Sequence, residues 1–139
     1  MPLLTHSSIH AFQLARLIGR VATIQRTCLK MALKESPGIE LEWYYFLHTI
    51  NERRQIRKTD VISLNLLAEP TTGIDILNRM ITAGLLMENI DPADKRARLL
   101  FISPKGRTIL TKAEKIVNQV AELLYGKTSP ALSPTTLTL

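Results

Sequence analysis

Residues 81–106 read ITAGLLMENIDPADKRARLLFISPKG, and this segment predicts a helix end, two strands and the start of another helix. Gly84 stands where a helix would end in the left-handed conformation that glycine adopts at little cost. The tetrapeptide Asp91-Pro92-Ala93-Asp94 favours a tight turn, because proline presets φ and aspartate accepts hydrogen bonds from nearby backbone. Ser103 is a natural N-cap, with Pro104 at the first helical position. The segment therefore predicts a β-hairpin between two helices.

The two predicted strands are the apolar run Leu85–Met87 and the return strand Leu99–Ile102. Lys95, Arg96 and Arg98 cluster at the tip that joins them. A charged hairpin between two helices has the shape of a DNA-binding wing.

The order and spacing of these residues resemble a family pattern. Gly84-Leu85, Asp91-Pro92, Asp94-Lys95-Arg96-Ala97 and Ser103-Pro104-Lys105-Gly106 are similar to the winged-helix signature of the MarR family of bacterial transcription regulators. The resemblance covers roughly residues 40–125. It implies a mainly α protein with a small β-hairpin (α+β), in which a winged helix-turn-helix core is held between long N- and C-terminal dimerisation helices.

Length and composition place the chain among ordinary soluble proteins. Its 139 residues fit one domain, and hydrophobic and charged residues make up 45% and 22%. No apolar run reaches the ~18 residues that cross a bilayer. The first residues lack a secretory pattern, and a single cysteine cannot form an internal disulfide. We expect a cytoplasmic protein without a cofactor.

The net charge of +6 favours polyanionic partners, but the charge is unevenly distributed. Residues 1–58 carry nine basic and four acidic side chains, and residues 104–139 carry five and two. Residues 59–103, which include the presumed DNA reader, carry four basic and six acidic side chains. This acidic unit leaves an alternative open, a winged-helix protein–protein interaction module with little intrinsic DNA binding.

Periodicity divides the single domain, residues 1–139, into four parts. Residues 8–34 and 104–125 are long helices, residues 40–103 form the winged-helix core, and residues 126–139 are a tail rich in Ser, Thr and Pro. Inside the core, a helix over 40–53 is followed by a third helix capped by Thr59 and ending at Leu67. Glu69-Pro70-Thr71 is a predicted turn, and residues 72–83 form the fourth helix.

Both long helices carry a heptad stripe of apolar residues that a small core cannot cover, which favours packing against a second copy. The resemblance implies the same, because MarR-like proteins dimerise through their first and last helices and bind palindromic DNA. The predicted dimer contacts are Leu14, Leu17, Val21, Ile116, Val120 and Leu123. One departure from the family is the tail, whose two Ser-Pro steps are poorly suited to a further long helix.

The DNA contacts are predicted in three places. In the fourth helix, Ile74, Ile76, Leu77, Met80 and Ile81 share one half and the polar residues share the other, which a duplex would meet. Arg79 suits guanine and Asn78 suits adenine. By the resemblance, Arg96 reaches the minor groove and Asp94 pairs with it to orient the wing. The full predicted set is Thr71, Thr72, Asn78, Arg79, Lys95, Arg96, Arg98, Arg54 and Arg57. Two interpretations remain open for Arg54 and Arg57: they contact phosphates, or they form a solvated helix end.

Two carboxylates stand at positions where a DNA reader does not favour them. Asp75 lies in the middle of the polar face, and Glu88 replaces an arginine that is frequent in the family. Either the protein binds DNA modestly, or Asp75 pairs internally with Arg79 one turn away.

The remaining candidates concern small molecules and metals. In MarR-like proteins a crevice between the dimer helices and the reader binds small aromatic or phenolic acids, and the residues here that suit such a crevice are His10, Phe12, Trp43, Tyr44, Tyr45 and His48. These aromatic residues can equally belong to the core. Cys28 lies on the apolar stripe and is read as a packing thiol. His6 and His10 lack a third ligand, so no metal is expected, and no catalytic constellation predicts an enzyme.

The sequence thus predicts a sequence-specific DNA-binding regulator of MarR type, most simply a ligand-responsive repressor acting as a homodimer.

Overall fold

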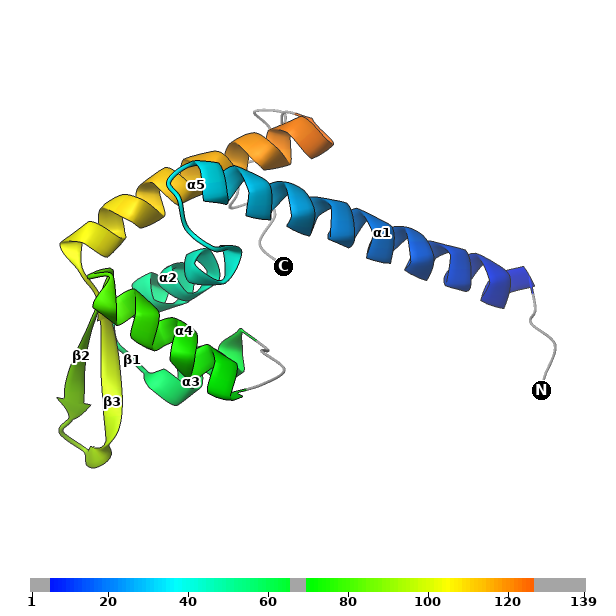
Figure 1. Cartoon of the computed structure of the whole chain (residues 1–139). Helices are drawn as coiled ribbons and strands as arrows, with labels where there is room; N and C mark the ends of the chain where they lie inside the picture. The colour runs from blue at the N-terminus through cyan, green and yellow to red at the C-terminus, as the bar shows by residue number, and fades with distance from the viewer. Residues whose placement is uncertain (1–5, 66–69, 127–139) are drawn as a thin grey trace.

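A computed structural model describes residues 6–65 and 70–126, apart from the side chains of residues 6–8, 70 and 71. Two long helices run over one side of the molecule, and a β-hairpin extends from the opposite side (Figure 1). The elements are α1 His6–Glu35, α2 Leu41–Arg53, β1 Ile56–Arg57, α3 Lys58–Leu64, α4 Pro70–Thr82, β2 Leu86–Asp91, β3 Asp94–Ile102 and α5 Pro104–Tyr125. The predicted fold class is confirmed, whereas the predicted tail lies outside the described residues from residue 127 on.

The base of the hairpin is closed by the end of α4 and the start of α5. Gly84 has φ +81°, as predicted for the helix stop. The Ser103 hydroxyl accepts from the Gly106 N–H at 2.9 Å and donates to the Gly84 carbonyl at 2.6 Å. A Cβ at Gly106 would overlap the Leu85 carbonyl oxygen, so only glycine allows this close approach. Both predicted helix boundaries are therefore confirmed.

The sheet has three antiparallel strands in the order β1-β3-β2. Strand β1 pairs Ile56 with Leu100, and β2 pairs Leu86 with Ile102. Strand β1 is absent from the sequence prediction, because two residues are too few to show an alternating pattern. The return strand, predicted from Leu99, begins at Asp94 in β3, so the cationic residues of the wing belong to a strand.

Several helix boundaries in the core differ from the prediction, most of all those of α3 and the start of α4. Helix α3 begins at Lys58 with Arg57 as an N-cap that makes no side-chain hydrogen bond, so Thr59 is not its cap. It ends at Leu64, and the predicted end at Leu67 lies outside the described residues. Helix α4 begins at Pro70 rather than residue 72, because proline is well suited to a first helical turn.

Two buried clusters connect the long helices to the winged-helix core. One lies beneath the hairpin and contains Phe46, Leu77 and Leu100, and the other joins the end of α1 to α5 through Leu33 and Ala113. The partly buried side chains Trp43, Tyr44 and Ile109 pack against both clusters. Helix α2 therefore couples the hairpin side of the molecule to the long helices. None of the described helices could cross a membrane.

Candidate nucleic-acid interface

Helix α4 presents a polar face to solvent. Ile76, Leu77 and Met80 are buried against the core, as the helical pattern predicts. Ile74 is the exception in that half, because 38% of it remains exposed. The exposed polar side chains are Thr72, Asp75, Asn78, Arg79 and Thr82. The side chain of Thr71 lies outside the described part of the chain.

Arg79 is exposed on α4 and acts electrostatically on the start of α2. The hydrogen bond and charge of Lys34 lower the pKa of the Glu40 carboxyl, and Lys30 and Arg79 add smaller contributions of the same sign. Arg79 is therefore within electrostatic range of the start of α2. Within residues 70–126, Asp75 and Arg79 form no ion pair, which disfavours the alternative that Asp75 pairs internally with Arg79.

Lys58 connects α3, α4 and the wing. Its Nζ donates to Asn78 Oδ1 at 2.7 Å and to Glu88 Oε2 at 2.7 Å. Arg98 Nε lies 3.8 Å from the other Glu88 oxygen. Glu88, which replaces a frequent arginine of the family pattern, is thus compensated by two cations instead of facing DNA as a free carboxylate.

Two aspartates shape the wing tip through its backbone. Asp91 Oδ1 accepts from the Ala93 N–H at 2.9 Å, and Asp94 Oδ1 accepts from the Arg96 N–H at 3.0 Å. Asp94 therefore contacts the backbone N–H of Arg96 and not its guanidinium, and its role in orienting the wing stays a prediction. Across the described segments, the exposed side chains of Lys95 and Arg96 make no hydrogen bond or ion pair. These two cations are available to phosphates or a groove.

Arg57 is paired with a buried aspartate, although its own side chain is 44% exposed. Its Nε and Nη2 each lie 2.9 Å from Asp91 Oδ2, and the Asp91 side chain is only 10% exposed. This charge-assisted pair ties β1 to the hairpin. Sequence spacing gives no sign of this partner 34 residues away. The predicted contact of Arg57 with phosphate stays a prediction.

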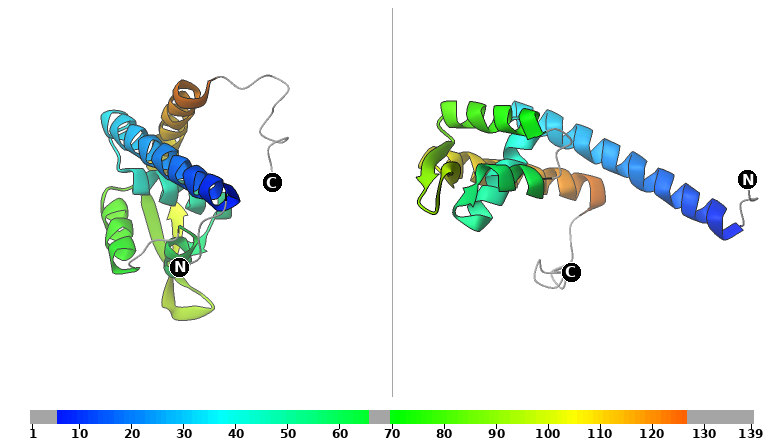
Figure 2. Two further views of the ribbon diagram at one scale, coloured as in Figure 1. Left: turned by 90° about the vertical axis from the view of Figure 1, so that its right-hand side faces the viewer. Right: turned by 90° about the horizontal axis from the view of Figure 1, so that it is seen from below.

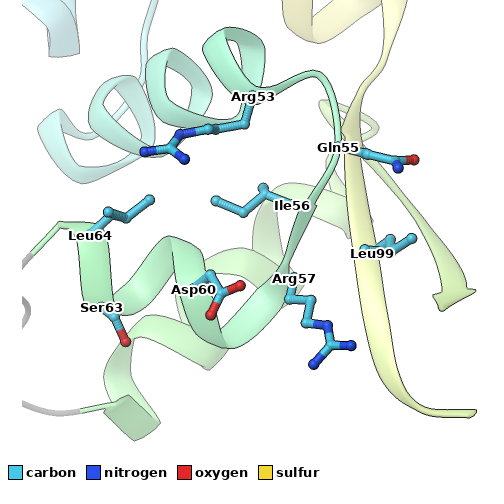
Figure 3. A pocket seen from close by; sticks show the side chains of 8 residues that line it. All are labelled: Arg53, Gln55, Ile56, Arg57, Asp60, Ser63, Leu64 and Leu99. Carbon is cyan, nitrogen blue, oxygen red and sulfur yellow. The ribbon is translucent and has the colours of Figure 1, made fainter. Parts of the chain in front are cut away.

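A cavity of about 610 Å³ opens between the end of α2, β1, α3 and β3 (Figure 3). Ile56 and Leu64 point toward one another below Arg53, whereas Arg57 points away. The chain enters β1 through a γ-turn at Arg54, with φ 66° and ψ −54° and a hydrogen bond of 2.7 Å from the Gln55 N–H to the Arg53 carbonyl. Arg54 is exposed on this turn, so its predicted contact with phosphate stays a prediction.

Only part of the predicted ligand pocket comes together among the described residues of one chain. Trp43 and Tyr44 are partly buried between the two core clusters. His10 and Phe12 lie on the part of α1 that extends beyond the rest of the molecule (Figure 2). His48 is exposed and lies 3.2 Å from Glu52 and 3.9 Å from Glu114.

The surroundings of the two tyrosines are also acidic. Burial and the charge of Glu114 raise the pKa of the Tyr44 phenol. The Tyr44 ring centroid is 5.6 Å from that of Tyr45 and 6.0 Å from that of His48. The acids near Tyr44 disfavour an anionic ligand at that end of the cluster. At the other end, the Trp43 indole Nε1 is buried and has no hydrogen-bond partner among the described residues, so it could donate to an anion.

The predicted dimer contacts separate into two groups. Leu14, Leu17 and Val21 are 59%, 58% and 46% exposed, and Leu123 is 84% exposed. In contrast, Ile116 and Val120 pack against α1 of the same chain, and Val120 is only 8% exposed. Cys28 packs in that cluster too, as predicted for a buried thiol.

For metals, the described residues hold no group of three or more His, Cys, Asp or Glu side chains placed to bind an ion. The side chain of His6 lies outside the described part of the chain.

Known proteins are similar to this chain in sequence and in fold. A family described as "Winged helix DNA-binding domain" matches residues 41–106. The transcriptional regulator HosA of Escherichia coli O111:H- is 30% identical over 95 residues, which cover 68% of this chain and 70% of HosA.

Two solved structures show the same fold. A MarR family transcriptional regulator from Streptomyces coelicolor, solved in complex with DNA, superposes with a TM-score of 0.78 at 18% identity, covering 94% of this chain and 81% of that one. Bordetella bronchiseptica BpsR, whose DNA binding is regulated by 6-hydroxynicotinic acid, gives 0.71 at 20% identity, covering 86% and 89%. Family members regulate transcription and are not enzymes, in agreement with the sequence prediction. With its helix-turn-helix, its wing and its kinship to HosA, this chain belongs to the MarR family of winged-helix DNA-binding transcriptional regulators.

Proposed function

We propose that the protein is a ligand-responsive repressor that binds a palindromic operator as a homodimer. The observation that carries this proposal is the bare apolar surface of α1. All residues from Ile9 to Ile24 are exposed in the single chain, and they include seven large apolar side chains: Ile9, Phe12, Leu14, Leu17, Ile18, Val21 and Ile24. An exposed apolar surface of this extent is unfavourable in water and is typical of a site that another molecule covers.

A second copy is the partner that best explains this surface. Helix α1 has 30 residues, and its C-terminal part packs against the rest of the described chain, whereas its N-terminal half extends away from it (Figure 2). A helix of that length spans about 45 Å, enough for two copies to pack side by side along their free halves. A symmetric pair would place two α4 helices and two wings on the same side, as a palindromic duplex requires.

The DNA-binding step is tested with a fragment of the protein's own promoter. Fluorescence anisotropy should give an affinity that falls as salt rises, because phosphate contacts release counterions. Footprinting should show two protected half-sites about one helical turn apart. Binding that is equally weak on every duplex and at every salt concentration would favour a protein–protein interaction module instead. The similarity to a transcriptional regulator does not favour that alternative.

The effector class we propose is a small aromatic or phenolic acid bound between α1, α2 and α5. The support comes from the unpaired indole N–H of Trp43 and from the regulation of BpsR by 6-hydroxynicotinic acid. In this proposal, His10 and Phe12 line the site only from the second copy. Binding there would change the angle between the long helices and the winged-helix core, and so the distance between the two readers.

The chain has one tryptophan, so its fluorescence reports directly on this site. Titration with salicylate and 6-hydroxynicotinic acid should change the emission of Trp43, and the same compounds should release the promoter fragment. A flat response across a panel of such acids would remove this effector class while leaving DNA binding intact.

A further inference from the structure

The Lys58 ammonium fixes the orientation of an amide on the exposed face of α4. Its Nζ lies 2.7 Å from the side-chain oxygen of Asn78, and its own side chain is only 18% exposed. An ammonium group donates and never accepts. The atom of the Asn78 amide that faces Lys58 must therefore be the oxygen, and the NH₂ group faces outward.

Glu88 holds the ammonium in this place. Its Oε2 also lies 2.7 Å from Lys58 Nζ, and its other oxygen is 3.8 Å from Arg98 Nε. The three side chains Lys58, Asn78 and Glu88 come from α3, α4 and β2, so the amide is fixed relative to both the helix-turn-helix and the wing. The glutamate that departs from the family pattern thus has a defined partner.

This orientation limits what Asn78 can read. An asparagine that recognises adenine needs both its donor and its acceptor, one for N7 and one for the N6 amino group. Here the oxygen is shared with a cation, which also repels the positively polarised hydrogens of a base amino group. The outward NH₂ group suits the major-groove acceptors guanine O6 and N7, thymine O4 and adenine N7. Among these, only adenine N7 lies beside an amino group, whose hydrogens the Lys58 cation repels, so guanine and thymine are favoured.

We propose that Lys58, anchored by Glu88, is a specificity-determining residue that makes Asn78 select guanine or thymine over adenine or cytosine. This replaces the adenine preference expected from the residue type alone. The inference rests on the proposed reading of DNA by α4. Lys58 is a positioning residue, since it acts on the base through Asn78.

The test is the selection of bound duplexes from a random pool by the full-length protein and its variants. Asn78→Ala identifies the base pair concerned, because only that position should lose its preference. In Lys58→Met the amide is free to turn, so the preference there should shift toward adenine by about tenfold. Asn78→Asp keeps the contact to Lys58 but lacks the donor, and should lose the preference for guanine or thymine.

Lys95→Met is the matched control, because Lys95 is an exposed lysine at the wing tip, outside this network. It should weaken binding to all duplexes and leave every base preference unchanged. If Lys58→Met behaves like Lys95→Met, the inference is wrong. A wild-type protein that enriches no sequence at all would instead overturn the proposed function.

A measurement on the protein without DNA distinguishes failure of the Lys58 inference from failure of the proposed DNA binding. The side-chain amide resonances of Asn78 should shift strongly in Lys58→Met and stay in place in Lys95→Met, whether or not DNA binds. Unchanged amide resonances in a folded Lys58→Met variant would show that Lys58 does not hold the amide, and the inference would fail.

Discussion

At the scale of single residues, the cationic side chains of the winged-helix core fall into two groups: those paired with an acid and those exposed without one among the described residues. Arg57 and Lys58 are held by Asp91 and Glu88, whereas Arg96 and Lys95 are exposed at the wing tip. A guanidinium suits a narrow, electronegative minor groove because it is planar and weakly hydrated. The residue type alone does not distinguish these cases, since the distinction depends on which acids are adjacent in space.

Arg96→Ala should weaken operator binding and lower the slope of log affinity against log salt by about one unit, because one phosphate or groove contact is lost. Anisotropy titrations over a salt series measure both quantities. Arg107→Ala, an exposed arginine on α5 away from the tip, is the control and should leave both unchanged. An unaltered slope in Arg96→Ala would place that residue outside the interface.

Gly106→Ala should lower the free energy of unfolding by about 1–3 kcal/mol, because the added methyl group meets the backbone carbonyl of Leu85. Urea unfolding at one fixed protein concentration measures the change. Gly19→Ala is the control, since nothing lies within 4 Å of the added Cβ and a helix-interior alanine should stabilise by about 0.5–1 kcal/mol. Equal stabilities of the two variants would contradict the close approach at Gly106.

At the level of elements, the wing is a rigid extension of two helices. Ser103 caps α5 and bonds the end of α4, Lys105 donates to the Ala83 carbonyl at 3.0 Å, and Arg57 ties β1 to the hairpin. The position of the wing tip relative to α4 is therefore set by hydrogen bonds at its base. Such fixed geometry lets two separate contacts meet the same duplex.

Ser103→Ala should destabilise the protein by about 1 kcal/mol, because the first turn of α5 loses its cap and the Gly84 carbonyl loses a donor. Thermal unfolding measures the loss, and hydrogen exchange should show faster exchange of the Gly106 N–H. Ser63→Ala is the control: its hydroxyl only donates to the Thr59 carbonyl within α3, so the effect should stay within about 0.5 kcal/mol. A loss no larger than that control would mean that this cap does little for stability.

At the scale of the whole molecule, the proposed dimer is formed by the exposed N-terminal half of α1. Leu17→Glu should shift the protein from dimer to monomer and reduce operator affinity by at least about tenfold, because a buried unpaired carboxylate is costly at an apolar interface. Sedimentation velocity at micromolar concentration, together with anisotropy, checks both. Ala15→Glu, on the opposite face of the same helix, should remain dimeric. A wild-type protein that sediments as a monomer would contradict the proposed assembly itself.

Much of the molecule follows from the amino-acid sequence alone. The glycine at residue 84, the turn at residues 91–94 and the cap at Ser103 act through local backbone preferences, so they identify the hairpin and the family without tertiary information. The long helices follow from an apolar period sustained over many residues.

Only the tertiary structure decided which charges are free. The pairs Arg57–Asp91 and Lys58–Glu88 join residues 34 and 30 positions apart, and the turn at Arg54 that precedes both cations has no local sequence marker. Nor does an apolar stripe reveal that Val120 packs inside the chain while Leu123 stays exposed. Local preferences act within a few residues, whereas these contacts depend on how distant elements approach one another, and short-range patterns carry no information about that approach.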